Sequence, residues 1–169
     1  MTCSNKQEQQ ELLNIVVVGG GATGVEVAGV LSEMKKFVLP NDYPDMPSSL
    51  MHIYLIEAGP RLLAGMSEES SAHAEQFLRE MGVNILLNKR VVDYRDHKVV
   101  LEDGTEIATR TFIWVSGVTG VTIGNLDASL IGRGGRIKVD SFNRVEGMNN
   151  VFAIGDQCIQ LADENYPNG

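Results

Sequence analysis

The sequence is poor in cysteine, in basic residues and in long apolar runs, and each shortage excludes a class of protein. Its two cysteines, Cys3 and Cys158, lie too far apart for a CxxC redox pair or a cysteine zinc site. Fourteen basic against 22 acidic residues give a net charge of −8, so nucleic acid is not an expected partner. No apolar run reaches the roughly 18 residues of a membrane span, and the polar N-terminus predicts no signal peptide. We therefore expect a globular domain in a reducing, cytoplasmic compartment.

The sequence also lacks the patterns of metal and nucleophile chemistry. The three histidines, His52, His73 and His97, are scattered without ligand spacing, so no metal site is expected. Ser116 lacks the G-x-S-x-G context of a nucleophile. No catalytic side chain is therefore predicted. The single tryptophan, Trp114, is expected to be buried in a strand, with a stacking platform as the alternative.

Glycine, by contrast, is abundant, with 18 residues, and its placement predicts the first structural unit. The β-branched run at residues 14–18 predicts a buried strand, and apolar residues at helical spacing predict a helix over residues 25–38. Between them stands Gly19-Gly-Gly-Ala-Thr-Gly24, which satisfies G-x-G-x-x-G. A second strand is predicted at residues 52–56, after a proline-rich loop at residues 40–47. The order of strand, glycine turn and helix is the context that a dinucleotide-binding motif requires.

The three glycines of this motif have separate roles in a dinucleotide site. Gly19 permits the tight turn, Gly21 lets a pyrophosphate approach the backbone, and Gly24 lets the helix pack close to the strand. Phosphates then meet free amides at the helix N-terminus, where the helix dipole favours negative charge. The other residues of the turn that we assign to the site are Gly20, Ala22 and Thr23.

Glu57, at the end of the second predicted strand, is the acid expected beside the ribose. A carboxylate there accepts hydrogen bonds from the adenine-side ribose hydroxyls and repels a 2′-phosphate, which favours NAD(H) over NADP(H). It stands 33 residues after Gly24, more than the usual spacing of about 20. We interpret the proline-rich loop as an insertion that accounts for the surplus. Arg61 can pair with a phosphate, which weakens the preference for NAD(H).

The remaining pattern completes an α/β fold. Ser67 predicts the start of a helix that ends near Met81, and a third strand follows at residues 83–87. The later predicted elements are a meander of three short strands (90–94, 98–102 and 106–109), a buried strand (111–115) and two late short strands (136–139 and 151–154). The predicted fold is a Rossmann-like parallel sheet with flanking helices and a three-stranded antiparallel meander as a crossover.

Four stretches resemble a known family. Residues 15–28 (IVVVGGGATGVEVA) resemble the nicotinamide-nucleotide fingerprint of two-dinucleotide flavoproteins, and among these they are most similar to type II NADH:quinone oxidoreductase. Residues 113–118 (IWVSGV) resemble that family's Trp-Ala-Ala-Gly-Val stretch, with Val115 and Ser116 departing from the alanines. Residues 150–156 (NVFAIGD) resemble the second flavin motif, and residues 166–169 (YPNG) resemble the segment that leads into the quinone-side helix.

The resemblance implies an NADH-binding domain at residues 1–125 and a return segment of an FAD-binding domain at residues 126–169. In the parent enzyme hydride passes from NADH to FAD and electrons pass on to a quinone, a chemistry that the cofactors supply. The second glycine motif of an FAD domain is absent, so the chain is expected to be an excised, inactive domain that meets FAD only in the full-length parent. That parent is expected at the cytoplasmic face of the inner membrane, bound peripherally through a missing C-terminal segment. An apolar flavin-facing surface on the excised domain can drive homodimerisation.

The resemblance also assigns roles to single residues. Glu26 is expected near the nicotinamide, although a carboxylate favoured by the helix dipole explains it equally well. Gly117 and Val118 are expected to place the nicotinamide against the flavin. Asp156, after Gly155, is expected to hydrogen-bond the flavin's ribityl or pyrophosphate region, or else to cap a helix. Position alone makes Val91 a candidate for the adenine pocket, with a core valine as the alternative.

Two other functions stay open on the sequence. One is an NADH-binding domain of another two-dinucleotide flavoprotein, such as a ferredoxin or disulfide reductase. The other is a non-catalytic module that senses NAD(H). The flavin motif at residues 150–156 speaks against the sensor, because a sensor needs no flavin contact. The insertion at residues 40–47 and the YPNG segment favour the quinone reductase.

Overall fold

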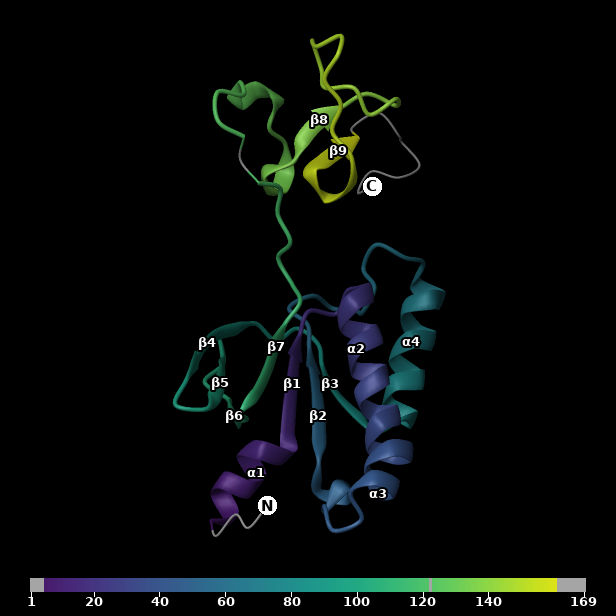
Figure 1. Ribbon diagram of the computed structural model, residues 1–169, viewed down its shortest axis with the longest axis vertical. Helices are drawn as coiled ribbons and strands as arrows, with labels where there is room; N and C mark the ends of the chain where they lie inside the picture. The colour runs from purple at the N-terminus through teal and green to yellow at the C-terminus, as the bar shows by residue number, and fades with distance from the viewer. Residues whose placement is uncertain (1–4, 122, 161–169) are drawn as a thin grey trace. The chain divides into compact units, whose positions relative to one another are not determined.

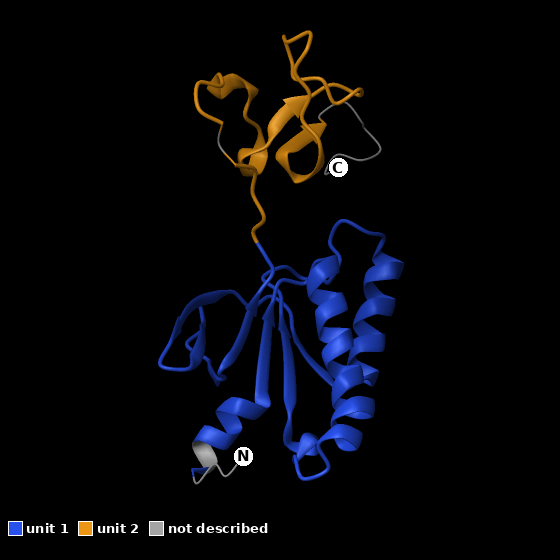
Figure 2. Ribbon diagram, in the orientation of Figure 1, with its two compact units in different colours: residues 1–116 blue, residues 117–169 orange. Residues whose placement is uncertain are grey.

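The computed structural model describes residues 5–121 and 123–160, and the chain divides into two compact units (Figure 2). Unit 1 comprises residues 1–116 and unit 2 residues 117–169. The structural division therefore lies earlier in the chain than the boundary between residues 125 and 126 that the resemblance implies. The assignment of the two parts to NADH and FAD domains stays a prediction. Cys3 and the YPNG segment lie outside the described residues.

Unit 1 is built on a four-stranded parallel sheet in the order β3-β2-β1-β7 (Figure 1). The strands are β1 (Asn14–Val18), β2 (His52–Ile56), β3 (Val83–Leu86) and β7 (Thr111–Trp114). Val18, the last residue of β1, pairs with Ile56 on one side and Trp114 on the other. The carboxyl ends of three strands therefore meet at one edge, and the predicted parallel sheet is confirmed.

Two helices cover one face of this sheet. Ile15 and Val17 of β1 belong to the same buried cluster as Ala28 of α2 (Ala22–Glu33) and Leu78 of α4 (Glu68–Glu80). Successive side chains of a strand point to opposite faces, so these alternate residues share the helical face. The two helices lie close together at Gly29, where a Cβ would make an ordinary van der Waals contact with Leu78 Cδ2, at 3.8 Å.

The meander covers the opposite face. Val16 and Val18 of β1 pack with Val99, Leu101 and Ile107 in a second buried cluster. The meander strands are β4 (Val91–Arg95), β5 (Lys98–Leu101) and β6 (Glu106–Ala108). The expected meander crossover is confirmed, with helices α2 and α4 on one face of the sheet and the meander on the other (Figure 1). Burial on both faces explains why residues 15–18 of β1 are continuously apolar.

The helix boundaries follow local chemistry, with one correction. Ser67 caps α4, since its side chain accepts a hydrogen bond from Ser70 N at 3.1 Å, and Gly82 ends it with φ +86°. The loop predicted from residue 40 is wrong at its start, because α3 (Leu39–Asp42) places Pro40 in a first helical turn, where no N–H is needed. A π-helical segment, Met34–Val38, and the short 3₁₀ turn η2 (Ser48–Leu50) flank it.

Polar contacts join the N-terminal helix to the start of β7. Helix α1 (Lys6–Leu13) carries Glu11, whose carbonyl and carboxylate both accept from Arg110, at 2.8 and 3.1 Å. The Thr109 hydroxyl is fully buried and donates to Asn14 O at 2.6 Å. Within the residues that the structure describes, no helix has the length and apolarity to cross a membrane.

Unit 2 has a small core around two short parallel strands, β8 (Ile137–Val139) and β9 (Cys158–Gln160). Three 3₁₀ turns accompany them: η3 (Ala128–Leu130), η4 (Arg133–Gly135) and η5 (Gly155–Gln157). The strand predicted near residues 136–139 is confirmed. The strand predicted at residues 151–154 is wrong, since only Phe152 forms a single bridge, to Arg144. An apolar run needs a partner strand as well as a pattern, and here Phe152 and Ile154 stay exposed.

Candidate functional site

The carboxyl edge of the sheet in unit 1 holds a small, open pocket of about 130 Å³. The glycine turn follows β1, Glu57 follows β2, and Ser116 stands just beyond β7. The lining includes Gly19, Glu57, Lys89, Arg90, Val91 and Trp114. In open α/β sheets ligands bind outside the carboxyl ends of the strands. The pocket therefore lies where a ligand of this fold class is expected.

Two glycines of the turn are required by the packing of the chain itself. A Cβ on Gly24 would lie 1.7 Å from Gly19 O, so only glycine lets α2 approach the turn this closely. Gly19 has φ +117°, a conformation that L side chains rarely adopt, and a Cβ there would lie 2.8 Å from Ser116 Cβ. These contacts agree with the turn and packing roles predicted for both residues.

Gly21 differs, because nothing inside the described chain requires it to be glycine. Its φ of −74° suits any residue, and a Cβ at this position would meet no atom within 4 Å. It is the N-cap of α2 and offers no side-chain acceptor to the first-turn amides, which have no intrahelical partners. The open space beside Gly21 and these amides together form a cradle for an anionic group.

Glu57 holds the glycine turn in place. Its carboxylate accepts from Gly20 N through Oε2 and from Gly59 N through Oε1, both at 2.6 Å. Its backbone N–H donates to Leu86 O at 2.9 Å, and Leu63 N donates to Gly20 O at 2.7 Å. Gly20 is thus held through both its N–H and its carbonyl oxygen. Sequence reasoning assigned Glu57 to the ribose alone and missed this anchoring role.

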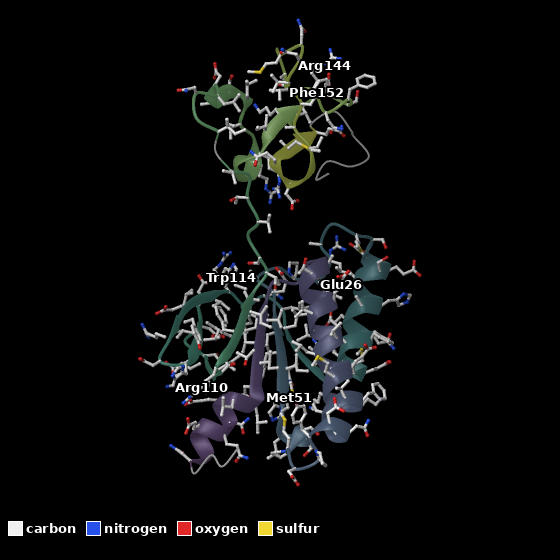
Figure 3. All side chains as sticks on the ribbon, viewed as in Figure 1. Glu26, Met51, Arg110, Trp114, Arg144 and Phe152 are labelled. Carbon is white, nitrogen blue, oxygen red and sulfur yellow. The ribbon has the colours of Figure 1, made fainter. Side chains whose placement is uncertain are left out.

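The other predicted residues of unit 1 lie around this edge in different ways. Glu26 is exposed on α2, at the end of unit 1 that also carries Trp114 (Figure 3). The Arg61 guanidinium donates to Ala64 O at 2.8 Å and to Met66 O at 3.0 Å, so it binds its own loop. Val91 is half-buried; it lines the pocket and also packs against the meander cluster. Both interpretations of Val91 thus have a structural basis.

Trp114 is a site residue that sequence reasoning missed. Its expected burial is wrong: the side chain is 54% exposed, lines the pocket, and donates from Nε1 to Ser116 O at 2.8 Å (Figure 3). Phe112, two residues earlier, packs against it edge-on at 6.0 Å. The sequence could have indicated this role through the position of Trp114, because the last residue of a parallel strand lies at the ligand-binding edge of the sheet.

Lys89 and Arg90 were missed as well. Both line the pocket, and both face acids of the turn after β5. Lys89 Nζ forms an ion pair with Asp103, and Arg90 Nε lies 3.8 Å from Glu102 Oε2. The Lys89 ammonium and the Thr105 amide hold the pKa of Asp103 well below its usual range. Their place directly after the third strand was the signal in the sequence.

The candidates in unit 2 form a separate group. Arg136 joins two of them, because Nε donates to Asp156 O at 3.1 Å and Nη2 to Val118 O at 3.3 Å. Gly117 and Gly155 have positive φ, +76° and +65°. Their predicted contacts with nicotinamide and flavin stay predictions.

The fold and the pocket define an α/β domain of the dinucleotide-binding class. The family pattern described as pyridine nucleotide-disulphide oxidoreductase matches residues 2–169, and the chain belongs to this family. A type II NADH:quinone oxidoreductase of Haemophilus influenzae is 33% identical over 161 residues, which is 95% of this chain and 36% of that protein. One from Mycobacterium tuberculosis is 34% identical over 158 residues, 88% of this chain and 34% of that protein.

Solved structures agree with this membership. NDH2 of Plasmodium falciparum, solved in complex with NADH, superimposes with a TM-score of 0.80 at 26% identity, over 95% of this chain and 34% of that one. A ferredoxin reductase of Rhodopseudomonas palustris, at 20% identity and a TM-score of 0.62 over 91% of this chain and 35% of its own, shares the fold. The chain spans about a third of the length of the curated relatives that it matches.

Proposed function

We propose that this chain is the NAD(H)-binding domain of an FAD-dependent NADH dehydrogenase that reduces a quinone. The observation that carries the proposal is the open cradle at Gly21, where a side chain would fit and the chain gives no packing reason for its absence. The names of the relatives, type II NADH:quinone oxidoreductases, support the wider reaction. The likeness to NDH2 solved with NADH supports the nucleotide.

In this proposal unit 1 binds and orients the nucleotide. The pyrophosphate lies against the glycine turn and the first amides of α2, and the ribose hydroxyls donate to lone pairs of Glu57 that its two amide bonds leave free. Val91 and Trp114 flank the adenosine half of the pocket. Because Glu57 already fixes Gly20, the turn is ordered before the nucleotide arrives, which lowers the entropic cost of binding.

The flavin half of the proposal rests on unit 2. A bound FAD supplies the chemistry of accepting hydride from NADH and passing electrons to a quinone. Gly155 and Asp156 offer a tight turn followed by a carboxylate, which suits contacts with the ribityl or pyrophosphate region. Peripheral binding to the cytoplasmic face of a membrane and homodimerisation are further proposals for the whole protein.

The test compares two glycines that are equally open. Gly21→Val places a side chain in the cradle, and Gly65→Val is its matched control, since a Cβ on Gly65 also meets nothing within 4 Å. We expect Gly21→Val to weaken NADH binding by about tenfold or more, a change of about 1.4 kcal/mol, and Gly65→Val to leave binding unchanged. Fluorescence of Trp114, the single tryptophan, reports the titration. Equal NADH affinity in both folded variants would overturn the proposed site.

A further inference from the structure

The pocket beside Glu57 contains two cations that would favour a 2′-phosphate. Lys89 and Arg90 both line it, and Lys89 N donates to Glu57 O at 3.0 Å, which fixes this segment to the peptide of the acid itself. One carboxylate and two cations would leave the pocket electropositive. Basic side chains bind phosphate by charge-assisted hydrogen bonds. With these cations free, Glu57 alone would not exclude NADP(H).

Two acids from the turn after β5 pair with these cations. Asp103 accepts from Lys89 Nζ, and Glu102 lies within ion-pair distance of Arg90, at 3.8 Å. The backbone holds both acids in position, because Glu102 N donates to Arg90 O at 2.8 Å and Asp103 Oδ1 accepts from Thr105 N at 3.0 Å. With these acids counted, negative charges outnumber positive ones at the pocket.

We propose that the Glu102–Asp103 turn of the meander is a second determinant of nucleotide specificity. It occupies Lys89 and Arg90 and so withholds them from the 2′-phosphate of NADP(H), while Glu57 repels that phosphate directly. This inference rests on the proposed function, since it takes the pocket as the site of the adenosine half. The meander therefore acts as more than a cover for one face of the sheet.

The test is Asp103→Asn, with Glu106→Gln as matched control. Asparagine keeps an oxygen that can accept from Thr105 N but loses the charge that holds Lys89. Glu106→Gln removes one negative charge from the same meander, where Glu106 pairs with Lys98 at 2.6 Å outside the pocket lining. The ligands are NADH and NADPH, and the half-site probes 5′-AMP and adenosine 2′,5′-bisphosphate, which differ by the 2′-phosphate.

We expect Asp103→Asn to raise the affinity for NADPH and the bisphosphate about three- to fivefold, with NADH and AMP within about twofold of the wild type. The gain should shrink at high salt and disappear when Lys89→Met is added. Glu106→Gln should leave all four affinities unchanged. Suppose that the wild-type chain binds NADH, and that in both variants the affinities for NADH and NADPH change equally or not at all. The inference is then wrong and the proposed function stands. If the wild-type chain binds no dinucleotide, the proposed function fails and this inference fails with it.

Discussion

The two units differ in how much they bury. Unit 1 covers both faces of a four-stranded sheet, and its fully buried side chains include Ile53, Leu55 and Val17. Among the residues of unit 2 that the structure describes, the buried cluster is formed by Ile137, Val139, Val145 and Ala153, around strands of three residues each. Unit 2 leaves Val121, Phe142 and Ile154 more than 70% exposed. Small cores give marginal stability, so we expect unit 2 to be the less stable of the two units.

The largest expected effect is the loss of stability when Gly24, which packing requires to be glycine, is replaced. The comparison is with Gly147, which only its backbone conformation requires to be glycine. Gly24→Ala in unit 1 would place a Cβ 1.7 Å from Gly19 O, and we expect a loss of about 3 kcal/mol or more in the free energy of unfolding. Gly147→Ala in unit 2 meets no neighbour but has φ +72°, so it should cost about 1–2 kcal/mol. Urea unfolding followed by circular dichroism measures both. Equal midpoints for the two variants would contradict the packing argument.

A second prediction concerns the independence of the two cores. Leu55→Ala empties a fully buried site in unit 1 and should cost about 2–5 kcal/mol. Val145→Ala, 2% exposed, should cost about 2 kcal/mol in unit 2. Amide hydrogen exchange should show faster exchange confined to the unit that carries each substitution, and slower exchange in β1 than in β8 of the wild type. Acceleration of both units by either variant would show a single cooperative core instead.

The third prediction concerns Glu57. Glu57→Ala removes both carboxylate bonds to Gly20 N and Gly59 N, and hydrogen bonds to charged groups contribute about 1.5–3 kcal/mol each. We expect weaker NADH binding together with faster exchange of the glycine-turn amides, and no change in unit 2. Glu69→Ala, an acid in the first turn of α4, is the control. Unchanged NADH affinity would remove Glu57 from the site.

The smallest expected effect is a pH dependence in unit 2. Hydrogen bonds from Arg144 N and Phe142 N, both 2.9 Å, lower the pKa of Asp140 from its ordinary 3.8. A carboxyl group whose pKa is lowered by folding contributes its full stabilisation at a pH above the pKa of the unfolded chain. This stabilisation is lost as the pH falls through the pKa of the folded state. Asp140→Asn should therefore lower the melting temperature of unit 2 slightly at pH 7, and the difference should vanish in strong acid. A difference in melting temperature that persists in strong acid would show that the charge of Asp140 is not the cause of the destabilisation.

The elements that sequence predicted best are those with local causes. Residues 15–18 of β1 form a continuous β-branched run that is visible in the sequence itself, and Ser67 marks a helix start because its hydroxyl caps a nearby amide. The element predicted worst, residues 151–154, has the right composition but forms one bridge. The loop predicted from Pro40 was wrong for a related reason, since the effect of a proline depends on its position within a helical turn.

The amino-acid sequence by itself determined the parallel sheet, the glycine turn and the acid at the end of β2, because strand pattern, glycine spacing and strand ends are local properties. Only the tertiary structure decided what surrounds that acid. Glu57 bonds to Gly20, 37 residues away, and Trp114 reaches the same pocket from β7. Lys89 meets Asp103 because β4 and β5 pair antiparallel, with Val91 opposite Leu101. Charge at a site is a sum over neighbours in space, and those neighbours are brought together by the packing of distant segments.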